Sequence, residues 1–188
     1  LMILGIDIST SCTGFCVLDE AGNPVHFSNV QLSNVENFFE KAKKVKNHIH
    51  GLIIKYSIKE IAVEDYLTSF ARGRSSSRTL FKLAKFNGIV QWICYNDFEI
   101  TADPINVNNA RKINNIIVLS KKKTEESTKD QVLRQVKEIV GEKFQFPTKI
   151  LKSGPRKGME VLEKSSYDMA DAFVIAKAKW IENSKIKD

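Results

Sequence analysis

The sequence begins with the stretch MILGIDISTSCTGFCVLDEAGNPV, residues 2–25, in which two apolar runs flank a short polar turn. Residues 2–8 and 13–19 are typical of two neighbouring strands, and residues 24–31 can add a third strand to complete an antiparallel meander. Asp7 lies within the first apolar run. Burial of an unpaired carboxylate is costly, so Asp7 needs a compensating partner or a place at the open end of its strand. A metal ion would be such a partner.

The rest of the chain alternates between helical and extended patterns. Apolar residues recur at three- and four-residue steps between Val35 and Ile53, which predicts a long helix capped by Ser33 or Asn34. The later predicted elements are, in order, a buried strand at 59–64, a helix after residue 77, a short strand at 98–102 ended by Pro104, a polar and mobile stretch at 114–128, a helix at about 128–141, an irregular stretch at 147–158 and a helix at about 165–183. This order predicts an α/β fold in which a mixed five-stranded sheet, three antiparallel strands and then parallel strands, is flanked by helices.

Length and composition restrict the class of protein. With 188 residues, 43% hydrophobic and 27% charged, the chain has the composition of a soluble globular protein, and we expect one domain over residues 2–188. The sequence contains no apolar run long enough to span a membrane and does not start with a signal segment, so we expect a cytoplasmic rather than a secreted protein with no membrane partner. The three cysteines, Cys12, Cys16 and Cys94, are an odd number in apolar settings, which favours reduced, buried thiols.

The net charge of +7 is unevenly distributed. Residues 1–40 contain five acidic residues and no Lys or Arg, so the rest of the chain is strongly basic. A basic body with a few acids set into apolar segments indicates a polyanionic partner that is bound around a carboxylate site. A lysine-rich surface that serves only solubility is the alternative.

Four acidic residues lie where a purely structural sequence would not place them. Asp7 is in the first strand, Glu64 ends the apolar run Ile-Ala-Val, and Asp168 and Asp171 open the last helix at a spacing that places both on one face. The carboxyl ends of parallel strands meet at one edge of a sheet, so Asp7 and Glu64 can be neighbours. Four such oxygen ligands suit Mg²⁺, with Mn²⁺ as a substitute, and two ions can be held together for phosphodiester hydrolysis. Taken singly, Asp168 can be a helix N-terminal residue and Glu64 can pair with a lysine.

These acids resemble the pattern of a known family. Gly5-Ile6-Asp7, the later Thr13-Gly14, Glu64 and the run Asp168-Met-Ala-Asp171-Ala resemble the RuvC-type Holliday junction resolvases of the ribonuclease H-like superfamily, and a divergent phage- or virus-type member fits best. The segment Ser127-Thr-Lys129-Asp-Gln-Val also resembles that family, whereas Ile8-Ser9 stands where the family has Pro-Gly. The resemblance implies a ribonuclease H-like fold and a homodimer that resolves four-way DNA junctions by paired symmetric nicks. It also implies metal ligation by the four acids and a place for Lys129 near the scissile phosphate. From the residues alone, Lys129 can equally be a solvated lysine at a helix start.

Basic and aromatic side chains are the candidates for DNA contact. Arginines close behind Glu64 and a basic run later in the chain can bind phosphates, and aromatic residues there can stack on unpaired bases or pack in the core. The candidates are Tyr66, Phe70, Arg72, Arg74, Arg78, Arg111, Lys112, Lys121, Lys122 and Lys123. A weaker basic patch covers residues 149–157. If the family architecture holds, the helix after Glu64, with Phe81, Phe86 and Trp92, supplies part of the dimer contact.

Other classes of protein share parts of this pattern. Residues 3–10 also resemble the first phosphate loop of sugar kinases and actin-like ATPases, but those proteins need two such domains and 188 residues are too few. A ribonuclease H-like nuclease that acts on RNA or an RNA–DNA hybrid would use the same four acids. A relative that binds junctions without cutting them is the third alternative, although carboxylates that repel phosphate would not help it. A branch-migration helicase partner is left open by the sequence.

Overall fold

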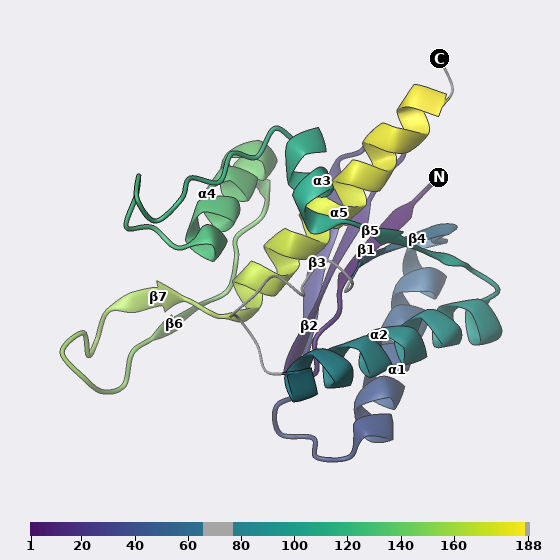
Figure 1. The fold of residues 1–188 in the computed structure, drawn as a ribbon, viewed down its shortest axis with the longest axis horizontal. Coiled ribbons are helices and arrows are strands. Elements are labelled where there is room, and N and C mark those ends of the chain that lie inside the picture. The colour runs from purple at the N-terminus through teal and green to yellow at the C-terminus, as the bar shows by residue number, and fades with distance from the viewer. Residues whose placement is uncertain (66–76, 187–188) are drawn as a thin grey trace.

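The computed structural model describes residues 1–65 and 77–186, and its centre is a five-stranded sheet in the order β3-β2-β1-β4-β5 (Figure 1). The first three strands form an antiparallel meander, and the last two run parallel to β1, so the predicted mixed sheet is confirmed. The strands are β1 (Ile3–Asp7), β2 (Cys12–Leu18), β3 (Pro24–Gln31), β4 (Glu60–Glu64) and β5 (Ala102–Ile105).

Helices cover both faces of this sheet (Figure 1). One face packs against α1 and α2, and the other packs against α5 together with α3 and α4. Successive side chains of a strand point to opposite faces, so Leu4 and Ile6 lie in the core with α1 and α2 while Ile3 lies in the core with α5. By the same alternation Asp7 belongs to the α5 face. The helices are α1 (Phe38–Tyr56), α2 (Ser77–Phe98), α3 (Val107–Ile113), α4 (Thr128–Val140) and α5 (Ser165–Ile186).

Two glycines let α5 lie directly on the sheet. A Cβ atom at Gly5 would be 2.2 Å from the carbonyl oxygen of Ala172, and one at Gly14 would be 2.2 Å from the carbonyl oxygen of Asp168. Any larger residue at either position would push the helix away, because real Cβ atoms do not approach other atoms this closely. The close approach brings the start of α5 to the end of β1.

Some predicted element boundaries are wrong, each for a local reason. The first helix is capped by Asn37, whose side chain accepts from the N–H groups of Phe39 and Glu40, and not by Ser33 or Asn34. The fifth strand of the central sheet is Ala102–Ile105 rather than residues 98–102, and it contains Pro104. Proline is tolerated there because β5 is an edge strand that pairs only with β4.

Two later stretches also differ from the expectation. Part of the stretch expected to be irregular forms a short hairpin of β6 (Thr148–Ile150) and β7 (Glu160–Leu162), which the sequence signal missed because its strands have three residues each and are largely exposed. Residues 114–127 contain no helix or strand, but the side chains of Gln131 and Gln135 hold the backbone of this stretch at Leu119 and Ile117.

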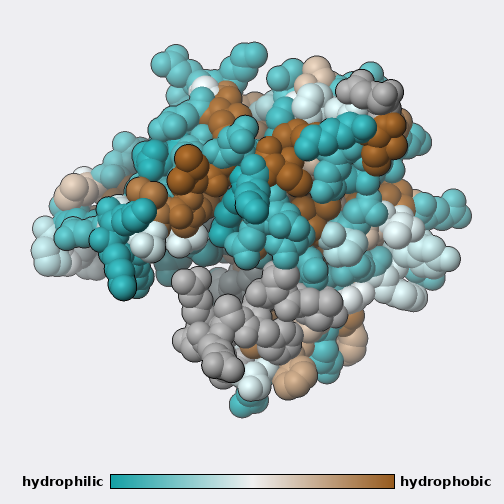
Figure 2. Space-filling view, turned by 45° about the horizontal axis from the view of Figure 1, so that its top comes forward, coloured by the Kyte–Doolittle hydropathy of each residue, from teal (hydrophilic) through white to brown (hydrophobic). Residues whose placement is uncertain are grey.

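The surface carries few large apolar areas in the view of Figure 2, where hydrophilic side chains predominate and hydrophobic ones form separate patches between them. Within residues 1–65 and 77–186, no helix is both long enough and apolar enough to cross a membrane.

Candidate metal centre

The structure brings the four acids singled out in the sequence to one pocket. Asp7 is the last residue of β1 and Glu64 the last residue of the neighbouring parallel strand β4, so both lie at the same edge of the sheet. Asp168 and Asp171 lie in the first turns of α5, which Gly14 allows to reach that edge. All four side chains line a cavity of about 300 Å³. The predicted juxtaposition of the strand ends and the helix start is therefore confirmed as geometry.

Burial changes the acidity of three of these carboxylates, Asp7, Asp168 and Asp171. Burial, and then the charges of Glu64, Asp171 and Asp168, hold the pKa of Asp7 well above its usual value. Burial likewise raises the pKa of Asp171 to about 6, against the opposing effect of Arg111. Burial also raises the pKa of Asp168, whereas Cys12 and Lys129 lower it. Clustered, desolvated carboxylates of this kind are costly without a nearby cation and are characteristic of functional sites.

Two basic side chains reach into the same pocket. Arg111 of α3 places a guanidinium nitrogen 3.6 Å from Oδ1 of Asp171, and Lys129 of α4 places its ammonium 3.9 Å from Oδ1 of Asp168. Arg111 is largely buried, with 19% of its side chain exposed, whereas Lys129 is 61% exposed. Among the described residues, Nε of Arg111 and Oδ1 of Asp171 are the buried side-chain atoms that have no hydrogen-bond partner. The family resemblance implied a place for Lys129 near this site, but the sequence gave no sign that Arg111 faces Asp171.

The donor set can be compared with the requirements of a metal ion. Four carboxylates offer only oxygen atoms as ligands, and oxygen is the ligand that Mg²⁺ and Mn²⁺ prefer. Oδ1 of Asp171 has no hydrogen-bond partner, so a cation could occupy that place. The side chains do not form a ready-made cage, since no three His, Cys, Asp or Glu residues in the described part of the chain are placed to hold an ion together. The residue types therefore fit a hard divalent cation, but their side chains would have to turn toward it.

Neighbouring polar residues fix the elements that carry these side chains. The side-chain amide of Asn87, which is 2% exposed, donates to the carbonyl oxygen of Glu64 at 3.0 Å and so ties the end of β4 to α2. The hydroxyl of Tyr167 donates to Asp130 at 2.6 Å, which ties the start of α4 to the start of α5 and keeps Lys129 beside Asp168. Asn87 was not predicted as a residue of this site, although a polar residue on the apolar face of a helix is a signal that could have identified it.

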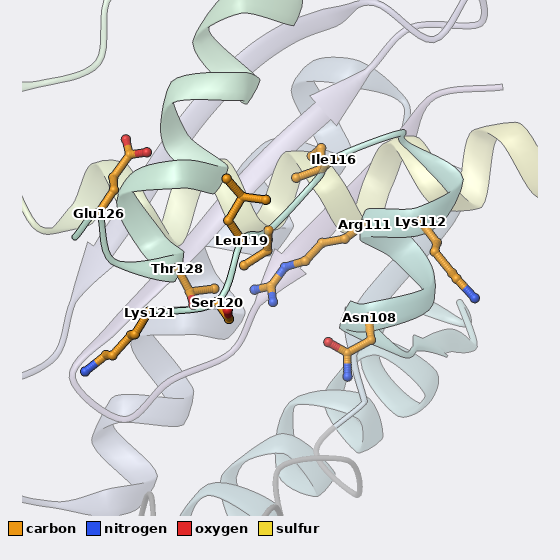
Figure 3. A pocket seen from close by; sticks show the side chains of 10 residues that line it. Asn108, Arg111, Lys112, Ile116, Leu119, Ser120, Lys121, Glu126 and Thr128 are labelled. Carbon is orange, nitrogen blue, oxygen red and sulfur yellow. The ribbon is translucent and has the colours of Figure 1, made fainter. Parts of the chain in front are cut away.

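The predicted DNA contacts fall into three groups. Tyr66, Phe70, Arg72 and Arg74 lie outside the described residues. Arg78 is exposed in the first turn of α2, and Lys122 and Lys123 are exposed after α3. Arg111, Lys112 and Lys121 line a second pocket beside the carboxylates (Figure 3). Figure 3 shows the guanidinium of Arg111 extending from α3 toward Leu119, whereas Lys112 and Lys121 point away from it in opposite directions. Their contact with DNA remains a prediction.

This mixed sheet, with a helix laid on its glycines, has the fold of solved RuvC structures. The structure of Thermus thermophilus RuvC in complex with a Holliday junction substrate matches with a TM-score of 0.65 and 16% sequence identity over 98% of this chain and 96% of that chain. A second Thermus thermophilus RuvC structure matches with a TM-score of 0.63 and 17% identity over the same shares.

The yeast mitochondrial Holliday junction resolvase Ydc2 is also similar, with a TM-score of 0.60 and 14% identity over 98% of this chain and 80% of that chain. Compared by sequence, the chain matches no protein-family model and no curated protein. At these low identities the structural likeness defines the fold, and it confirms the predicted fold class.

Proposed function

We propose that this protein is a metal-dependent endonuclease that resolves four-way DNA junctions by paired symmetric nicks. The observation that carries the proposal is the convergence of Asp7, Glu64, Asp168 and Asp171 on one pocket, in a chain whose fold is that of RuvC. A protein that only binds DNA gains nothing from four carboxylates that repel phosphate, and the cost of burying Asp7 is understandable if a cation joins them.

The same four carboxylates would hold the divalent cations, Mg²⁺ or Mn²⁺, with two ions as the expected number. When bound, these ions supply a nucleophile at neutral pH and stabilise the leaving oxygen of an in-line attack on phosphorus. Ligation requires ionised carboxylates, so the raised pKa values of Asp7, Asp168 and Asp171 imply that ion binding competes with protons and weakens as the pH falls.

The other residues of the pocket have roles that follow from their charge and place. The exposed ammonium of Lys129 is free to turn from Asp168 to a phosphate oxygen, where it would stabilise developing negative charge. Arg111 would balance the charge of Asp171 until a cation and a DNA strand are present. Asn87 would orient the end of β4 and hence Glu64 through its bond to the Glu64 carbonyl oxygen.

The substrate would be held by basic residues around this pocket. Arg78, Lys112 and Lys121 to Lys123 are exposed cations on the elements that surround it, and contacts of this kind with phosphates make binding dependent on salt. Symmetric nicks on two strands require two active sites, which a homodimer would supply. The outer face of α2 supports this dimer because Phe81, Trp92 and Tyr95 are 63%, 60% and 66% exposed on one side of the helix. Phe86, in contrast, is part of the core.

A panel of labelled substrates tests the proposal. The protein is incubated in Mg²⁺ or EDTA with a synthetic four-way junction, a linear duplex of the same sequence and an RNA–DNA hybrid. We expect two nicks at symmetric positions in the junction, only in the presence of Mg²⁺, and no cutting of the linear duplex.

Each of the other outcomes would indicate a different function for this protein. Cutting of the hybrid with an intact junction would move the function to RNA processing. Tight binding of the junction without cutting in any metal would mean that the protein is a junction-binding relative, and it would refute the catalytic proposal.

A further inference from the structure

A second pocket lies directly beside the carboxylate pocket and has a chemistry of its own. It occupies about 500 Å³ between α3, the stretch 116–121 and the start of α4, which is within the range of roughly 300–1,000 Å³ typical of small-ligand sites. It shares Arg111 with the carboxylate pocket, and Thr128 lines it while the next residue, Lys129, lines the carboxylate pocket. Its lining residues are Asn108, Arg111, Lys112, Ile116, Val118, Leu119, Ser120, Lys121, Glu126 and Thr128.

One wall of this pocket is built rigidly although it contains no helix or strand. The side chain of Gln131, which is 2% exposed, accepts from the N–H of Leu119 at 2.7 Å and donates to the carbonyl oxygens of Leu119 and Glu126. Gln135 pairs in the same way with both backbone groups of Ile117, at 3.0 and 2.8 Å. Five backbone polar groups of an irregular segment are therefore satisfied by α4, so the pocket wall is preformed.

The pocket offers three kinds of contact. Ile116, Val118 and Leu119 give it an apolar wall, and Leu119 is 43% exposed toward solvent. Arg111 gives it positive charge inside, and Lys112 and Lys121 add positive charge around it with their ammonium groups directed outward. Glu126 does little to offset this charge, because it is engaged by Arg134 at 3.1 Å.

The polar groups of the pocket, Asn108, Ser120 and Thr128, can donate and accept hydrogen bonds at its rim. An anion that carries a flat, partly apolar ring with polar edges, which is to say a nucleotide, would use all three kinds of contact.

We infer that this second pocket receives one unstacked nucleotide of the bound strand, next to the phosphate that is cut, and that its lining sets the sequence preference of cleavage. The inference rests on the proposed function. At a branch point bases lack stacking partners, so turning one outward costs less than it does in a continuous duplex. Arg111 would hold the phosphate of this nucleotide, since it faces both pockets, and Asn108 would read the edge of the base.

Two matched pairs of variants test the inference. Asn108→Ala removes a side-chain amide that lines the pocket. Asn109→Ala is its control, because Asn109 is exposed and does not line the pocket. The backbone N–H groups of both residues donate to the side chain of Asn106. Leu119→Ala shortens the apolar wall, whereas Ile117→Ala shortens an exposed neighbour whose backbone is held by Gln135. Each protein is assayed on junctions that differ only in the bases next to the cleaved phosphate.

In a second measurement, the junction carries 2-aminopurine beside the cleaved phosphate and binding is followed in EDTA by its fluorescence. For the wild type we expect a spread of rates between the best and worst base of roughly five- to 150-fold, the discrimination that one good side-chain contact to a base provides. Asn109→Ala and Ile117→Ala should keep this spread and the fluorescence change. Asn108→Ala and Leu119→Ala should reduce both at least threefold.

An unchanged spread and an unchanged fluorescence signal in Asn108→Ala and Leu119→Ala would overturn the inference while the proposed function stands. A wild-type protein that neither binds nor cuts junctions would overturn both.

Discussion

At the scale of single residues, the site is a cluster of carboxylates, of which Asp7 is buried from solvent. Asp7 is 8% exposed, and the charges of three other carboxylates, Glu64, Asp171 and Asp168, act on it. The sequence revealed Asp7 and Glu64 because they lie within or at the end of an apolar run, and it revealed Asp168 and Asp171 because their spacing places both on one face of the last helix. It did not reveal the role of Arg111, which looked like part of a basic run. Its place opposite Asp171 depends on α3, a seven-residue helix with one buried residue, Ala110, and so with no apolar pattern to detect.

The raised pKa of Asp7 predicts a pH-dependent cost to folding. In the unfolded chain Asp7 ionises near 3.8, while the folded protein keeps the proton to a higher pH. The folded state binds more protons between these two pKa values, so stability falls as the pH rises through this window, and the full cost is present above it. In EDTA at pH 8, Asp7→Asn should therefore raise the melting temperature, on the order of 3 °C for each kcal/mol relieved.

Near pH 4, where the folded protein already carries the proton, this gain should largely disappear. Thermal melts of both proteins at the two pH values check the prediction. A variant that is less stable than the wild type at pH 8 would contradict it.

At the scale of elements, the close packing of α5 on β1 and β2 positions the two aspartates of the helix against Asp7. This packing depends on Gly5 and Gly14, whose meaning the sequence alone does not show, because the same glycines occur in turns and bulges. The edge strand with Pro104 and the β6–β7 hairpin were also mispredicted. Their residues become extended through pairing with a neighbour rather than through a pattern of their own.

Gly14→Ala tests the contact between β2 and α5. The new methyl group would meet the backbone of Asp168 at 2.2 Å, so the start of the helix must move, and we expect a loss of roughly 1–3 kcal/mol in the free energy of unfolding together with a loss of junction cleavage. Gly51→Ala is the matched control, because a Cβ atom at Gly51 in α1 meets nothing, and alanine there should stabilise the helix by about 1 kcal/mol. Urea titrations give both values. Equal effects of the two substitutions would refute the role of Gly14.

At the scale of the whole molecule, Asp7 from the acidic first 40 residues meets Glu64, Asp168 and Asp171 from the later part of the chain. The later part also supplies the basic surroundings, as its positive charge in the sequence indicated. The order of the longer strands and helices was predictable because long apolar patterns determine it, whereas the short elements α3, β6 and β7 were not predicted. The proposed pairing of two molecules was expected only from the family resemblance, since an exposed apolar stripe on α2 and an ordinary amphipathic helix have similar sequences. The pair is nonetheless what two symmetric nicks require.

Trp92→Glu tests the proposed dimer. If the outer face of α2 is the interface, a charge at Trp92 should convert a wild-type dimer into a monomer in sedimentation velocity, and the remaining cuts in the junction should no longer be paired. Ile54→Glu introduces the same charge at a residue of α1 that is 68% exposed, and it should leave the dimer intact. A monomeric wild type, or a dimer that survives Trp92→Glu, would show that α2 is not the interface.

The central claim is that the carboxylate pocket cuts four-way junctions with the help of a divalent metal. The most direct test is the rate of junction cleavage by the wild type and by Asp7→Asn in Mg²⁺, with junction binding measured for both in EDTA. We expect the wild type to make paired nicks, and we expect Asp7→Asn to bind the junction with similar affinity while its cleavage falls by about a hundredfold or more, equivalent to roughly 3 kcal/mol of lost transition-state stabilisation. Cleavage by Asp7→Asn at the rate of the wild type would contradict the account.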